Sequence, residues 1–190
     1  MGASFAMEKA VISILGPDRP GIIAAATRIL FDDGCNIENV SQTTLQTEFS
    51  GIFIVSIPEE LTIEALNRHL ESALGPLDQH VYVKPLLPGT TSFNTADCER
   101  FVIATRGPDQ KGLVARITEV ISRHGVNVTN LQAIFKGGDK PVDNVMIYEV
   151  DVPPDADQSA LYSDLRQRAA DLGLTISIQH RRIFEAINRV

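Results

Sequence analysis

Hydrophobic and polar positions follow the same succession of periods in the two halves of the chain. Short β-branched, apolar runs predict strands, and apolar residues at helical spacing predict helices between them. In the first half the predicted elements are a strand, a helix, two strands, a helix and a strand, at about residues 10–15, 22–33, 37–46, 49–57, 63–74 and 79–84. In the second half the same order recurs at about residues 101–105, 113–124, 126–135, 142–152, 160–172 and 175–178.

Local signals predict where the helices begin and end. Asp18 is expected to cap the first helix, with Pro20 in its first turn and Gly34 as its C-terminal stop. The second helix of each half is expected to start at a side-chain cap, which is Thr62 in the first half and either Asp157 or Ser159 in the second.

One loop sequence occurs twice in the chain. Gly16-Pro17-Asp18-Arg19-Pro20-Gly21 corresponds to Gly107-Pro108-Asp109-Gln110-Lys111-Gly112, at an offset of 91 (107 − 16 = 91). The same offset relates Gly34-Cys35-Asn36 to Gly125-Val126-Asn127. One offset across a whole unit indicates a duplicated domain.

The predicted fold class is α+β, with two tandem ferredoxin-like βαββαβ domains whose antiparallel sheets carry both helices on one face. The expected domains are residues 7–85 and 99–190, joined by a turn-rich linker at residues 86–98. Such sheets leave free edges, so we expect them to pair side by side, within the chain or across a homo-oligomer. A longer turn at Lys136–Pro141 joins the hairpin strands of the second domain, and the residues from Gln179 are expected to extend the last strand or to form a basic tail.

Composition narrows the class of partner. A net charge of −7 and a pI of about 5.0 argue against direct binding of nucleic acid. No apolar run approaches the length of a membrane span, and the residues before Met7 lack the pattern of a signal peptide, so no membrane association is expected. Cys35 and Cys98 do not form a disulfide framework, which favours the cytoplasm.

The repeated loop has chemistry that fits an amino acid. Gly21 and Gly112 remove a side chain where a strand turns into a helix, and the free N–H groups of a helix start favour a carboxylate. Asn36 and Asn127 follow the helix stop and offer an amide to a neighbouring cleft. The alternative is structural, because these residue types also serve as caps and turn residues.

The loop Gly-Pro-Asp-Arg-Pro-Gly-Ile after a first strand, followed by Gly-Cys-Asn-Ile, resembles the ACT domain, a small regulatory module. Two such domains with little else resemble the glycine cleavage system transcriptional repressor family. The resemblance implies binding of a small amino acid, with glycine and serine as candidates, and a protein partner that is a transcription factor. It implies ligand-binding positions at Asp18, Arg19, Pro20, Gly21 and Asn36, and at Asp109, Gln110, Gly112 and Asn127.

The second copy departs from this pattern. Gln110-Lys111 replaces Arg19-Pro20, which makes the turn less rigid and adds a positive charge. The first copy is therefore the expected working site. No nucleophile-and-base constellation, cofactor fingerprint or metal-ligand spacing is visible, so no catalytic residue, cofactor or metal is assigned. The predicted function is a non-enzymatic, amino-acid-sensing regulator; the alternative is a ligand-independent structural or protein-interaction module that uses its sheet edges and basic tail.

Overall fold

The computed structural model describes residues 8–87, 97–134 and 144–182. The chain divides into two compact units, residues 1–90 and 91–190, which are called domain 1 and domain 2 below. The turn expected at Lys136–Pro141, the strand ends expected at Phe135 and Val142, most of the expected linker, and the chain after Arg182 lie outside the described residues.

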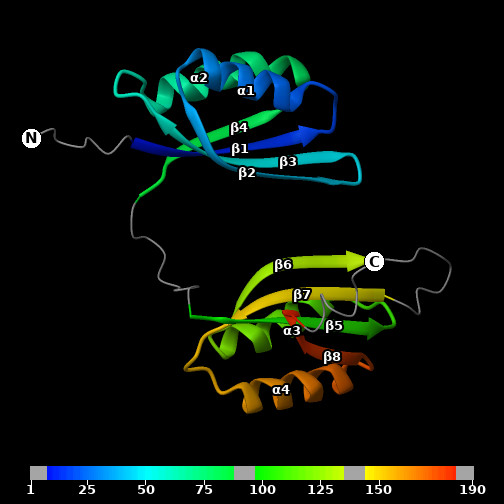
Figure 1. Cartoon of the computed structure of the whole chain (residues 1–190). Helices are drawn as coiled ribbons and strands as arrows, with labels where there is room; N and C mark the ends of the chain where they lie inside the picture. Colours follow the sequence, from blue (N-terminus) through cyan, green and yellow to red (C-terminus); the bar gives the residue numbers. More distant parts are fainter. Residues whose placement is uncertain (1–7, 88–96, 135–143, 183–190) are drawn as a thin grey trace, which may run out of the picture. The chain divides into compact units, whose positions relative to one another are not determined.

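Domain 1 is a four-stranded antiparallel sheet in the order β2-β3-β1-β4. Its elements are β1 (Glu8–Pro17), α1 (Ile22–Asp32), β2 (Asn36–Leu45), β3 (Glu48–Ile57), α2 (Ile63–Leu74), a short 3-10 helix η1 (Gly75–Leu77) and β4 (His80–Pro85). Both helices lie on one face of the sheet (Figure 1).

Domain 2 repeats this topology, with the strand order β6-β7-β5-β8. Its elements are β5 (Glu99–Gly107), α3 (Leu113–Arg123), β6 (Asn127–Ile134), β7 (Asn144–Val152), α4 (Gln158–Asp171) and β8 (Thr175–His180) (Figure 1). The two tandem ferredoxin-like βαββαβ domains predicted from the sequence are therefore confirmed. The expected extension of the last strand is also seen, since β8 continues to His180.

The core of each domain lies between its sheet and its helix pair. Alternate residues of β1 face the helices, and Ala10, Ile12 and Ile14 are completely buried. Leu66 and Leu70, four residues apart on α2, meet this face because an α-helix brings such residues to one side. Burying each large side chain contributes about 1.5–3 kcal/mol, so the apolar side chains that the helices and the inner strands bury together hold these small domains together.

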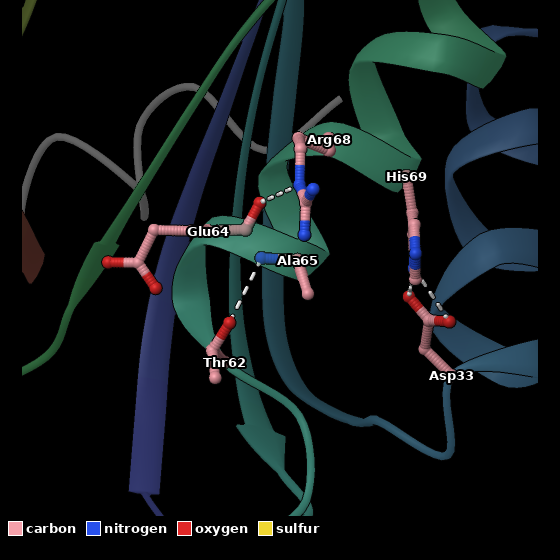
Figure 2. Close-up of polar contacts among 6 residues, drawn as sticks. All are labelled: Asp33, Thr62, Glu64, Ala65, Arg68 and His69. Carbon is pink, nitrogen blue, oxygen red and sulfur yellow. Dashed lines mark hydrogen bonds and ion pairs between the residues drawn. The ribbon is translucent and has the colours of Figure 1, made fainter.

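Two side chains cap the second helices as predicted. The Thr62 hydroxyl accepts a hydrogen bond from the Ala65 N–H at 3.2 Å (Figure 2), and the Asp157 carboxylate accepts one from the Ala160 N–H at 3.0 Å. Of the two caps considered for α4, Asp157 is the one used. Each of these side chains accepts a hydrogen bond from an N–H group of the first helical turn that has no acceptor within the helix.

The C-terminal stop predicted for α1 is also confirmed. Gly34 adopts φ +71°, and the Cys35 N–H donates to the Leu30 carbonyl at 2.8 Å, which closes the helix end. Just before this stop, the Asp33 carboxylate contacts Nδ1 of His69 on α2 at 2.9 Å (Figure 2). The pair joins the end of α1 to the middle of α2.

The edge strand β2 is exposed along its whole length. Val40 and Leu45 keep 50% and 74% of their surface accessible, which is unusual for apolar residues of a strand. Because β2 is also an edge strand among the described strands, its outer backbone groups and its apolar side chains are available for pairing. Among the described helices, none is long and apolar enough to cross a membrane.

Candidate ligand-binding site

The loop between β1 and α1 corrects two predictions about the helix start. Asp18 does not cap α1, and Pro20 precedes the helix instead of lying in its first turn. The Asp18 N–H donates to the Thr47 carbonyl at 2.7 Å, and its carboxylate accepts from the Thr44 hydroxyl at 3.5 Å. Asp18 therefore forms hydrogen bonds with the β2–β3 hairpin instead of with the start of α1.

Gly21 is the residue that actually starts α1. It has φ +100°, and no side chain caps the helix. A Cβ atom added to Gly21 would meet nothing within 4 Å, so the left-handed backbone, and not a lack of space, requires glycine here. The first intrahelical hydrogen bond runs from the Ala25 N–H to the Gly21 carbonyl at 2.8 Å. The N–H groups of the preceding turn have no intrahelical acceptor.

The residues of this helix start line a hollow of about 300 Å³, which is called the domain 1 hollow below. Its lining comes from the loop, the first turn of α1, and the hairpin: Asp18, Arg19, Gly21, Ile22, Ile23, Ala24, Gln42, Thr44 and Phe49. The size matches the lower end of known small-molecule sites. Three predicted site residues thus meet in one place, together with hairpin residues that the sequence did not indicate.

Domain 2 builds a corresponding start for α3. Gly112 has φ +85° and α3 lacks a side-chain cap, while the Arg116 N–H donates to the Gly112 carbonyl at 3.0 Å. Nε2 of Gln110 donates to the Leu172 carbonyl at 2.6 Å, so this side chain anchors the loop to the end of α4. The Asp109 carboxylate accepts from Nδ2 of Asn144 on β7 at 3.3 Å.

The resulting domain 2 hollow measures about 470 Å³. It is lined by Asp109, Gln110, Gly112, Leu113, Val114, Ala115, Asn144 and Met146. As in domain 1, the hollow lies at an uncapped helix start, where the backbone favours an anion. No group of three or more metal-ligating side chains occurs among the described residues.

The structure does not bring Asn36 to the loop of its own domain. Asn36 pairs with Ser56 at one end of the sheet, whereas Leu45 pairs with Glu48, which also pairs with Pro17 at the other end. Eight residues of strand separate Asn36 from Thr44, a distance of about 26 Å. Asn127 has the same position in domain 2, opposite Asp151, and neither asparagine lines the domain 1 or the domain 2 hollow.

Sequence reasoning missed Phe49 and Asn144, which occupy corresponding places. Phe49 pairs with Gly16, and Asn144 pairs with Gly107, so the offset at this point is 95 (144 − 49 = 95) instead of 91. The change arises because the segment between β6 and β7 is longer in sequence than the one between β2 and β3. Only strand register, which the sequence does not show, identifies the two positions as equivalent.

A family model described as the ACT domain matches residues 8–84 and again residues 99–179. The chain belongs to the ACT domain family. The tandem arrangement of this regulatory module, inferred above from the repeated loop, is thereby confirmed.

Relatives of this ACT protein include single-domain chains. A UPF0237 protein of Methanopyrus kandleri is 34% identical over 79 residues, which cover 41% of this chain and 88% of the relative. A UPF0237 protein of Pyrobaculum aerophilum is 44% identical over 66 residues, or 34% of this chain and 73% of the relative. Each match corresponds in length to one ACT domain.

Two solved structures resemble the whole tandem chain. An unknown protein from Galdieria sulphuraria has a TM-score of 0.74 and 22% identity, and covers 91% of this chain and 98% of its own. A proposed glycine cleavage system transcriptional repressor has a TM-score of 0.64 and 19% identity, and covers 90% and 96% respectively. The likeness to the repressor is therefore confirmed at the level of the tandem ACT fold.

Proposed function

We propose that this ACT protein is an amino-acid-sensing regulator in which a small amino acid, with glycine and serine as candidates, binds at the strand-to-helix loop. The observation that carries the proposal is the uncapped helix start behind a left-handed glycine, which opens into a hollow in both domains. Free N–H groups at such a start suit the carboxylate of an amino acid.

A second copy of the chain would bring Asn36 into the same site. β2 begins at Asn36 and ends beside the loop, and it is an edge strand among the described strands. If two β2 edges pair antiparallel, the start of one strand meets the end of the other. Asn36 of one copy then approaches the loop of its neighbour, so ligand binding and a homo-oligomer support one another.

The regulator would pass its ligand state to a protein partner. A ligand held between two copies of the chain stabilises the pairing that binds it better, and this alters the surface offered to the partner. By likeness to the proposed repressor, the partner is a transcription factor in the cytoplasm, and any effect on DNA is indirect because the chain carries a net charge of −7. The protein acts without catalysis, cofactor or metal.

A second candidate function is a ligand-independent interaction module. The exposure of every residue of β2, including Val40 and Leu45, favours it, because such an edge can recruit a partner strand without a small ligand. This alternative predicts that Asn36→Ala changes stability or association only.

Thermal unfolding of the full chain with each common amino acid at millimolar concentration tests the proposal. A ligand that binds only the folded state raises Tm, and we expect this for glycine or serine. Asn36→Ala should abolish a rise that arises at the domain 1 hollow, and Asn127→Ala one that arises at the domain 2 hollow, whereas Asn39→Ala, an exposed asparagine farther along β2, should retain the rise. No rise with any amino acid, in protein whose circular dichroism shows a folded chain, would refute the sensor and favour the interaction module.

A further inference from the structure

The floor of the domain 2 hollow holds a buried amide with an unused acceptor. Asn144 is only 2% exposed, and its Oδ1 has no hydrogen-bond partner among the described residues. Its Nδ2 donates to the Asp109 carboxylate, which can only accept, so the opposite orientation would set two oxygens against each other. In this orientation no described residue donates to the amide oxygen, and buried polar atoms are normally paired.

Domain 1 shows that the fold does not require an amide here. Phe49 takes the equivalent place, and its ring covers Gly51, since a Cβ on Gly51 would lie 2.9 Å from the ring. In domain 2 the corresponding residues are Asn144 and Met146, so a large and a small residue have exchanged places along the strand. A phenyl ring at this place in domain 1 is thus replaced in domain 2 by an amide, with a thioether two residues along.

The same side of the domain 2 sheet carries a second polar replacement. Thr105 is fully buried and its hydroxyl has no partner among the described residues, whereas the equivalent of Thr105 in domain 1 is the apolar Ile14. Thr105 pairs with Met146 and is not part of the hollow. It therefore provides a matched position at which an unpaired polar atom can be removed without altering the lining.

We infer that the domain 2 hollow is the amino-acid site, and that Asn144 and Asp109 form an acceptor pair for the ligand's α-ammonium group. An ammonium group carries hydrogen-bond donors for both acceptors, and its charge complements the Asp109 carboxylate. The carboxylate of the ligand then faces the uncapped start of α3. Nε of Arg116 lies 3.9 Å from where a Cβ on Gly112 would be, so this cation is near the helix start although it does not line the hollow.

This inference rests on the proposed function and assigns it to one domain. Domain 1 has Phe49 in place of the acceptor, so its hollow lacks the buried amide, and its cation is Arg19. The assignment reverses the preference for the first copy that the Arg19-Pro20 pair suggested from the sequence. A buried amide oxygen that no described residue pairs is stronger support for a ligand than a rigid turn, since a ligand can complete the missing hydrogen bond.

The test uses the full chain, isothermal titration calorimetry and ¹H–¹⁵N spectra with glycine and L-serine as probes. We expect one of them to bind and to shift the amide signals of Gly112 and Leu113, while those of Gly21 and Ile22 remain in place. Trimethylglycine keeps the carboxylate and the positive charge but has no N–H donor, so it should bind at least about tenfold more weakly than glycine.

Asn144→Leu removes the acceptor and should weaken binding about 10–100-fold, as expected for a hydrogen bond to a charged group. Thr105→Val removes the other unpaired atom and should leave the affinity unchanged. If the wild type binds an amino acid but Asn144→Leu binds equally well, or the shifts occur at Gly21, the inference fails while the proposed function stands. If no amino acid binds, both fail. Should Asn144→Leu not fold, the spectra of the wild type and its affinity for trimethylglycine test the inference instead.

Discussion

The two ACT domains have the same topology, but several equivalent contacts are made by residues that have exchanged positions between the two contacting elements. In domain 1 the first helix ends with Asp33 and pairs with His69 on the second; in domain 2 the corresponding residues are His124 and Asp164, which are 3.0 Å apart. The acid and the base have changed places. The exchange indicates that the contact between the helices matters more than which helix carries which charge.

The loops are anchored by the same kind of exchange. In domain 1, Nε2 of Gln79 reaches forward to the Pro17 carbonyl at 2.8 Å and to the Leu77 carbonyl at 3.1 Å. In domain 2, the amide comes from the loop, and Gln110 reaches the carbonyl of Leu172, the equivalent of Leu77. Both domains thus tie the loop to the end of the second helix, which keeps the hollow in place although the sequence around it has diverged.

The largest expected losses of stability come from substituting Gly16 and Gly107, because each of these equivalent glycines lies close to neighbouring atoms of its own domain. A Cβ on Gly16 would lie 2.5 Å from the Asp78 carbonyl oxygen, whereas a Cβ on Gly107 would first meet a Leu174 methyl group at 2.7 Å and then the Gly173 carbonyl oxygen at 3.0 Å. A backbone oxygen cannot rotate away as a leucine side chain can. Gly16→Ala should therefore destabilise domain 1 by about 2–4 kcal/mol, and Gly107→Ala should destabilise domain 2 by about 1–2 kcal/mol.

Urea unfolding followed by hydrogen exchange at β1 and β5 measures each domain separately. Equal losses in the two variants would show that the Asp78 turn moves aside as readily as the Leu174 side chain, and would contradict this difference between the domains.

The exchanged positions of Gln79 and Gln110 predict a smaller loss of stability, which a second substitution should partly restore. Gln79→Leu, which introduces the residue found at the equivalent position 174, leaves two carbonyl acceptors unpaired and should cost domain 1 about 1–2 kcal/mol. Adding Arg19→Gln supplies an amide at the place of Gln110 and should recover part of that loss. Urea unfolding of the single and double variants checks this. If the double variant is no more stable than Gln79→Leu alone, the two anchors are not interchangeable.

The sequence predicted the fold because buried positions repeat with the periods of strands and helices. The same signal underestimated β1, which extends from Glu8 to Pro17, because the ends of a strand pair through the backbone whatever their side chains. The N-cap prediction for Asp18 failed for a related reason. A left-handed glycine set the helix start, and the aspartate turned to the hairpin instead.

The site was only half predictable. The loop residues repeat at a constant offset, so they stood out from the sequence alone. Phe49 and Asn144 did not, because the longer segment between β6 and β7 changes the offset and only pairing with Gly16 and Gly107 aligns them. Residues of a hollow that come from distant strands become visible only when the register is known.

Cys35 and its counterpart Val126 predict a pH-dependent difference between the domains. Burial, with a smaller contribution from the charge of Asp33, raises the pKa of the Cys35 thiol from 9.0 to about 11. The unfolded thiol loses its proton first, so the stability linked to this group is complete below about pH 9 and is lost as pH rises toward 11. Domain 1 of Cys35→Val should lack this loss.

Urea unfolding at several pH values between 8 and 11, with the wild type and Cys35→Val compared at each, measures the effect. The pKa of Tyr148 in domain 2 is raised to about 12 by burial, and this is common to both proteins. Parallel pH profiles for domain 1 in the two proteins would show that the Cys35 thiol is solvated in the folded state.

The smallest expected effect tests the exchanged helix pair directly. Asp33→His or His69→Asp alone places two like residues at the contact between α1 and α2, and each should cost domain 1 about 0.3–1 kcal/mol, since His69 is half exposed. The double variant reproduces the arrangement of His124 and Asp164 and should return to wild-type stability. A double-mutant cycle in urea gives the coupling energy between the two positions. Additive losses would mean that His69 and Asp33 only lie close together. Rescue by the exchange would show that the contact itself stabilises the packing of α1 against α2.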